Sequence, residues 1–96
     1  MKVYDKAKWH NNCENNELNV KAYFQNLMEL LLKNNMLSED GREILDIGID
    51  NDFSLNSKLV NEKGNLFLGK NYDEILSSID FNNKISIDNI DKFFKQ

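Results

Sequence analysis

The hydrophobic positions follow a helical pattern most clearly over residues 18–34. At 100° per residue, the large apolar side chains gather on one side of this segment. They are Val20, Tyr23, Phe24, Leu27, Met28, Leu30 and Leu31. Because this apolar arc spans more than half of the circumference, we expect other elements to cover the helix on more than one side. The segment is therefore predicted to supply most of the core.

A shorter helix is predicted over residues 39–46. Ser38 is a typical N-cap, and Glu39 and Asp40 place carboxylates in the first turn, where the helix dipole favours them. Gly48 is expected to end the helix. Ile44 and Leu45 are expected to face inward, with Ile47 as a third candidate.

The middle of the chain shows a different pattern. Phe53 and Leu55 alternate with polar residues, and so do Leu66 and Leu68. Alternation of this kind is typical of strands. The stretch SKLVN-EKG-NLFLG is therefore predicted to form a β-hairpin, with Gly64 in its turn.

Shorter elements are predicted at the two ends of the chain. Asn71 followed by Glu74 is typical of a capped helix, predicted here over residues 72–79. A short strand or bridge is expected at residues 85–87, and Asp88 is expected to cap a last helix. At the N-terminus, residues 2–9 are predicted to form an edge strand or a single turn, with Trp9 in the core.

Together these elements predict one α+β domain over residues 1–96. Its long N-terminal amphipathic helix and its short helices would pack with a small antiparallel hairpin or sheet. The length of 96 residues allows only a small core, and the absence of proline leaves no element interrupted from that cause. The charged N-terminus is unlike a signal peptide, and no apolar run is long enough to span a membrane, so a soluble cytoplasmic protein is expected.

The net negative charge arises in one short stretch. Residues 39–52, EDGREILDIGIDND, carry six carboxylates and one arginine, a net charge of −5, whereas the whole chain carries −4. Such a patch attracts basic protein partners and repels nucleic acid. We expect partner binding at Glu43, Asp46, Asp50 and Asp52, with Glu39 and Asp40 at the rim. A charge run is also typical of an ordinary solvated surface.

Candidate chemistry is sparse. His10 is the only histidine and Cys13 the only cysteine, and a structural zinc site needs four ligands. If His10 and Cys13 formed a nucleophilic pair, they would need a positioned base and an oxyanion site. Their closeness in an asparagine-rich loop indicates neither. An enzyme using His10 and Cys13 is therefore a minor alternative, and His10 is expected to form a structural hydrogen bond. No metal, cofactor or small-molecule substrate is expected, and no residue is assigned a catalytic role.

The opening segment Val-Tyr-Asp-Lys-Ala-Lys-Trp-His, residues 3–10, carries a family resemblance. With the helix at 18–34 and the Leu37-Ser38-Glu39 junction, it resembles small bacterial immunity proteins of contact-dependent growth inhibition and related polymorphic toxin systems. The resemblance covers about the first forty residues and is strongest in the first ten. Residues 40–96 carry no further resemblance.

The resemblance implies a cytoplasmic, non-enzymatic protein that binds a cognate toxin domain and blocks its active site or its access to substrate. Nucleases are common among such toxins and need basic surfaces for phosphate. An acidic inhibitor could occupy such a surface without itself contacting nucleic acid or membrane. An acidic adaptor in a bacterial regulatory complex is the alternative that the same features allow.

Overall fold

The computed structural model describes residues 1–10 and 17–95 of the chain. In this part, four α-helices and two short 3₁₀ turns accompany a two-stranded antiparallel sheet. The elements in chain order are β1 (Val3–Lys6), η1 (Ala7–Trp9), α1 (Glu17–Lys33), α2 (Glu39–Ile47), β2 (Ser54–Asn56), α3 (Glu62–Ser77), α4 (Asp88–Asp91) and η2 (Lys92–Lys95). The predicted combination of helices with a small antiparallel sheet is confirmed.

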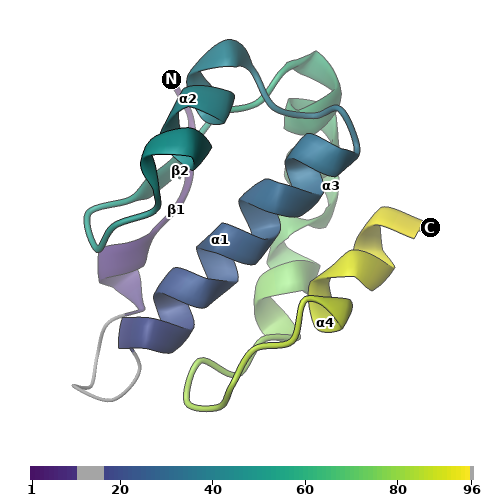
Figure 1. The fold of residues 1–96 in the computed structure, drawn as a ribbon. Coiled ribbons are helices and arrows are strands. Elements are labelled where there is room, and N and C mark those ends of the chain that lie inside the picture. The colour runs from purple at the N-terminus through teal and green to yellow at the C-terminus, as the bar shows by residue number, and fades with distance from the viewer. Residues whose placement is uncertain (11–16, 96) are drawn as a thin grey trace.

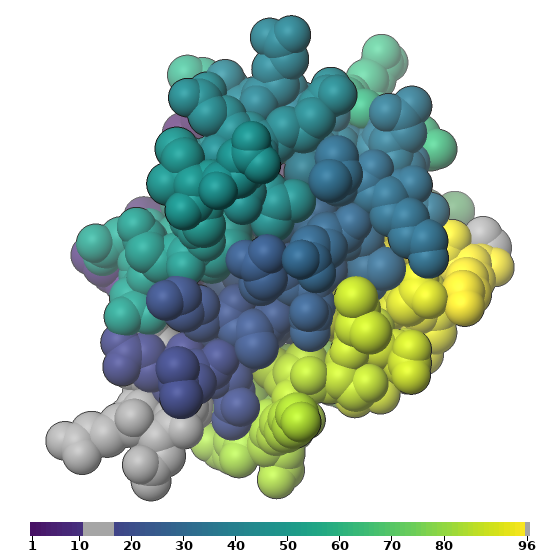
Figure 2. All heavy atoms as spheres, viewed as in Figure 1, coloured from purple at the N-terminus to yellow at the C-terminus, as the bar shows by residue number. Residues whose placement is uncertain are grey.

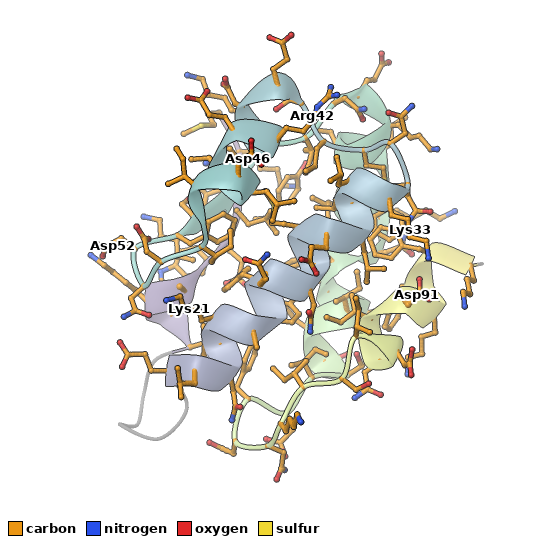
Figure 3. All side chains as sticks on the ribbon, viewed as in Figure 1. Lys21, Lys33, Arg42, Asp46, Asp52 and Asp91 are labelled. Carbon is orange, nitrogen blue, oxygen red and sulfur yellow. The ribbon has the colours of Figure 1, made fainter. Side chains whose placement is uncertain are left out.

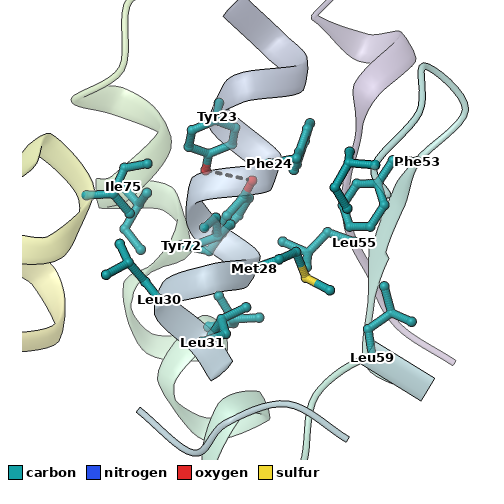
Figure 4. Packing of buried hydrophobic residues seen from close by; sticks show 14 of the residues in the cluster. Tyr23, Phe24, Met28, Leu30, Leu31, Phe53, Leu55, Leu59, Tyr72 and Ile75 are labelled. Carbon is teal, nitrogen blue, oxygen red and sulfur yellow. Dashed lines mark hydrogen bonds between the residues drawn. The ribbon is translucent and has the colours of Figure 1, made fainter. Parts of the chain in front are cut away.

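Helix α1 forms the centre of the molecule. It crosses the view of Figure 1 with α2 and the sheet on one side and α4 on the other, while α3 runs behind it. The seven apolar residues predicted to line its inner side are all buried. Burial of each such side chain contributes about 1.5–3 kcal/mol. The close view in Figure 4 shows Phe24 and Met28 of α1 facing Phe53 and Leu55, and Tyr23 and Leu30 facing Tyr72 and Ile75 of α3.

The N-terminal segment contains both the edge strand and the single turn that the sequence offered as alternatives. Residues Val3–Lys6 form strand β1, which pairs with β2 in the register Val3↔Asn56, Asp5↔Leu55 and Lys6↔Ser54, with an irregularity between Val3 and Asp5. The 3₁₀ turn η1 follows directly, and Ala7 N donates to Phe53 O at 3.0 Å. This bond attaches the turn to the residue just before β2.

The predicted β-hairpin is wrong, because helix α3 occupies much of its sequence. Residues 62–77 form one continuous helix, which includes both the expected second strand and most of the helix predicted at 72–79. The true N-cap is Asn61, whose side chain accepts from Gly64 N at 2.9 Å, so Asn71 lies inside the helix. The prediction failed because Gly64, Leu68, Tyr72 and Ile75 make one buried helical stripe that continues past Gly69.

The C-terminal predictions also need correction. Residues 85–87 form no strand or bridge. The last helix, α4, begins at Asp88, but Asp88 does not cap it. Instead the Ser86 hydroxyl accepts from Asp88 N at 3.3 Å, and the chain continues into η2.

Candidate functional site

Helix α2 carries much of the acidic stretch, is capped at both ends and is attached at its start to the segment after β2. The Ser38 hydroxyl accepts from Gly41 N at 3.1 Å and donates to Lys58 O at 2.6 Å. Gly48 ends the helix with a positive φ of 112° and donates its N–H to Ile44 O at 2.9 Å. The predicted cap and end of this helix are thus confirmed. Ser38 also links α2 to the segment that follows β2.

A groove of about 330 Å³ lies between α2, the loop after it and β2. It is lined by Ile44, Ile47, Gly48, Asp50, Asp52, Phe53, Ser54, Asn56 and Leu59. Phe53 and Leu59 are buried and Ile44 is half-buried, so the groove has an apolar floor. We call this feature the acidic groove, because its charged lining residues are two carboxylates.

The structure brings together two of the four predicted partner-binding residues. Asp50 and Asp52 line the acidic groove, and both are exposed. Glu43 and Asp46 are exposed on the same helix that supplies Ile44 and Ile47, but they do not line the groove. Figure 3 shows Asp46 on α2 and Asp52 at the far end of the loop that follows.

The two rim residues occupy the other end of α2. Glu39 and Asp40 lie in its first turn, as predicted, and both are exposed. They lie at the end of the helix opposite Gly48, which lines the groove. They add negative potential to this surface without taking part in the groove itself.

One groove carboxylate already has a partner. Lys8 Nζ lies 3.4 Å from Asp52 Oδ1, with both side chains more than two-thirds exposed. An exposed pair of this kind contributes little to stability and exchanges readily for another partner. The Asp50 carboxylate accepts from Asp52 N at 2.9 Å, which shapes the turn between them. Both carboxylates therefore lie at the groove and are accessible to a partner.

Two apolar residues lie outside the core, contrary to the sequence-based expectation. Ile47 was a candidate for the inner face of α2 but is 76% exposed at the edge of the acidic groove. Trp9 was expected in the core but is 56% exposed, with the Lys6 ammonium 5.9 Å from its ring centroid. The sequence holds no signal for either, because α2 ends at Ile47 and Trp9 ends η1, where helical periodicity no longer fixes direction.

A buried polar network connects β1 to the helices, and the sequence analysis missed its central residue. Asp5 is only 1% exposed. Its carboxylate accepts from His10 Nε2 at 2.7 and 2.8 Å, from the Tyr72 hydroxyl at 2.6 Å and from Lys6 N at 2.8 Å. Tyr23 in turn donates to the Tyr72 hydroxyl at 2.9 Å, the bond drawn in Figure 4. The carboxylate is therefore satisfied from several elements, as a buried charge requires.

Aromatic rings enclose this network. The His10 ring stacks on Phe81 with centroids 4.4 Å apart, and Phe81 meets Tyr23 edge to face at 5.2 Å. Burial raises the pKa of the Tyr72 hydroxyl well above its usual value, and the neighbouring Tyr23 and Asp5 raise it further. Burial likewise raises the pKa of Tyr23. Both phenols are therefore neutral hydrogen-bond donors at physiological pH.

The predicted hydrogen-bonding role of His10 is confirmed by its bonds to Asp5. Cys13, its expected companion in the enzymatic alternative, lies outside the described residues. Among residues 1–10 and 17–95, no three His, Cys, Asp or Glu side chains are grouped so as to hold a metal ion. The Asp5–His10 pair instead has a structural role. Asp5 of β1 binds His10 at the end of η1 and Tyr72 of α3, and so joins these three elements.

Comparison of the chain with protein-family models, with curated proteins and with solved structures found no match. No described helix is both long and apolar enough to cross a membrane. The candidate site therefore rests on the geometry of the acidic groove.

Proposed function

We propose that this chain is an immunity protein that binds and neutralises a cognate toxin domain through the acidic groove. The observation that carries the proposal is the placement of Asp50 and Asp52 at the edge of an apolar hollow beside the exposed Ile47. The resemblance of residues 3–10 to immunity proteins of contact-dependent growth inhibition supports it. The protein acts in the cytoplasm, without catalysis and without a cofactor.

The groove combines the two features that a protein interface uses. Buried apolar anchors provide most of the binding free energy, and surrounding polar groups set orientation and specificity. The hollow beside Ile44 and Phe53 can receive an apolar side chain of the partner, and Ile47 can enter a hollow on the partner's surface. The carboxylates at the edge then pair with basic groups around that contact.

The sign of the charge favours a basic partner. Six of the sixteen acidic residues lie between residues 39 and 52. A toxin that cleaves nucleic acid needs a basic surface for phosphate. An acidic inhibitor is steered toward that surface at long range and, once bound, excludes the substrate from it. A nuclease domain is thus the toxin class that this surface fits best.

Binding to the toxin domain encoded by the adjacent upstream gene tests the proposal. The two proteins should copurify and bind each other with a nanomolar Kd. The toxin should be inactive in the complex. An upstream product that is no toxin, or one that does not bind, contradicts the proposal. Binding to a non-toxin regulatory protein through the same groove would favour the adaptor alternative.

A variant at the apolar part of the groove, with a matched control, tests whether this part binds the toxin. Ile47→Ser should weaken toxin binding about tenfold, because it removes an exposed anchor at the interface. Leu66→Ser is the control, since Leu66 of α3 is 71% exposed, close to the 76% of Ile47, and does not line the groove. Calorimetric titration measures both. Equal Kd values for the two variants would remove Ile47 from the interface.

A further inference from the structure

A second hollow, of about 380 Å³, lies on the opposite side of α1 from the acidic groove. It is formed by the end of α1, the middle of α3 and the C-terminal turn η2. Its lining residues are Asn34, Met36, Lys63, Phe67, Lys70, Asn71, Phe93 and Phe94. On the face shown in Figure 2, the α2 region and the C-terminal segment lie on either side of the surface of α1.

The floor of this hollow is aromatic. Phe67 of α3 and Phe94 of η2 stack with ring centroids 4.4 Å apart and an interplanar angle of 25°. Both rings are half-buried, whereas Phe93, which also lines the hollow, is buried. The stacked pair therefore presents apolar surface that is fixed in place from two separate elements.

The charged groups of the hollow have the opposite sign to those of the acidic groove. Its lining, as far as the structure describes it, includes two lysines and no carboxylate. Lys63 Nζ donates to Asn34 O at 3.1 Å, which fixes this lysine against the end of α1. Lys70 is exposed seven residues further along α3, on the same side of the helix as Phe67. The two lysines are thus about 10 Å apart along the helix axis, with the aromatic floor between them.

We propose that this basic aromatic hollow is a second interaction surface, which binds a short acidic segment of a partner protein. The segment has two carboxylates about three residues apart, which spans about 9 Å in a polyproline II conformation, with an aromatic or aliphatic residue between them. The carboxylates pair with Lys63 and Lys70, and the apolar side chain packs on the Phe67–Phe94 stack. The inference does not depend on the proposed function of the acidic groove.

The charge of the molecule favours a peptide over nucleic acid as the occupant. Nucleic acid needs a continuous basic track along its backbone, and the described lining offers only two lysines. The net charge of −4 and the acidic stretch of α2 repel a polyanion, but they act only weakly on a short segment with two charges. Two lysines around an aromatic floor match such a segment in both charge and size.

Fluorescence anisotropy of a labelled Asp-Phe-Gly-Asp peptide with blocked ends, titrated with the full chain, tests this inference. We expect saturable binding that weakens as salt increases, and no binding of the corresponding Lys-Phe-Gly-Lys peptide. Lys70→Glu should weaken binding about fivefold, the effect of reversing one exposed ion pair. The matched control is Lys21→Glu, another exposed helical lysine, which lies outside the hollow and should leave the Kd unchanged.

Three results would overturn the inference. The first is equal affinity in Lys70→Glu and in the unaltered chain. The second is tighter binding of a short oligothymidylate than of the acidic peptide. The third is self-association in sedimentation experiments that Lys70→Glu abolishes, which would assign the hollow to a second copy of the chain. The double variant Asp50→Lys/Asp52→Lys should still bind the peptide, so the two surfaces can fail separately.

Discussion

At the scale of single residues, Asp5 is the buried group on which the N-terminal segment depends. A carboxylate taken out of water is costly unless donors surround it, and here His10, Tyr72 and Lys6 N supply them. His10 could be assigned a hydrogen-bonding role from the sequence. Asp5 could not, because its partner Tyr72 is 67 residues away and the contact exists only in the folded chain.

Asp5→Asn should destabilise the protein by about 2–3 kcal/mol. The substitution removes the charge and turns one acceptor oxygen into a donor that faces the donors of His10 or Tyr72. Asp73→Asn on the exposed side of α3 is the control and should change the free energy of unfolding by about 0.5 kcal/mol or less. Urea unfolding measures both. Equal midpoints would show that the network contributes nothing to stability.

At the scale of elements, the sequence predicts the helices whose caps and apolar periods agree. Helix α1 has an unbroken apolar side, and α2 has Ser38 before it and Gly48 after it. Helix α3 was misread because Gly64 was interpreted as a turn residue. In the fold, a Cβ at position 64 would overlap the carbonyl oxygen of Met36, so this glycine allows two segments to approach closely. That reason is tertiary, and no local pattern contains it.

Replacing a helical glycine by alanine should change the free energy of unfolding in opposite directions at positions 41 and 69. Gly41→Ala should destabilise the fold by about 1–3 kcal/mol, because its Cβ would overlap the carbonyl of Leu59. Gly69→Ala should stabilise it by about 0.5–1 kcal/mol, because a Cβ there would have no atom within 4 Å beyond the neighbouring backbone of its own helix, and alanine is the better helix former. Thermal unfolding of the two variants measures the difference. A stabilising Gly41→Ala would mean that α2 does not pack closely on the segment after β2.

At the scale of the whole molecule, the charged residues that line the two hollows have opposite signs. Asp50 and Asp52 line the acidic groove, and Lys63 and Lys70 line the basic aromatic hollow. Outside the hollows the signs are mixed, as Figure 3 shows with Arg42 on α2 and Asp91 on α4. The acidic stretch could be recognised in the sequence because it is local. The acidic groove could not, since its lining residues run from Ile44 to Leu59 and meet only in the folded chain, where α2 and β2 lie on either side of the groove. The same holds for the basic aromatic hollow, which joins three separate elements.

Alkaline pH should unfold the protein as a unit. Burial raises the pKa of Tyr23 and Tyr72 above the ordinary value of 10.0, so both phenols stay protonated in the fold at a pH where the unfolded chain ionises. The contribution of these two tyrosines to stability is therefore constant below about pH 10 and falls above it by up to about 1.4 kcal/mol per pH unit for each tyrosine. Tyrosinate absorbance and circular dichroism should change together. Ionisation of all three tyrosines without loss of helix would contradict the buried network.

The association rate with the toxin domain tests the proposed role of the acidic groove most directly. Asp50→Lys/Asp52→Lys and the control Asp73→Lys/Glu74→Lys both raise the net charge from −4 to zero, since each substitution adds two charges. Only the first changes the groove. Stopped-flow measurement should show association slowed about tenfold or more, with weaker salt dependence, in the groove variant, and slowed much less in the control. Equal rates for the two variants would contradict docking through the acidic groove.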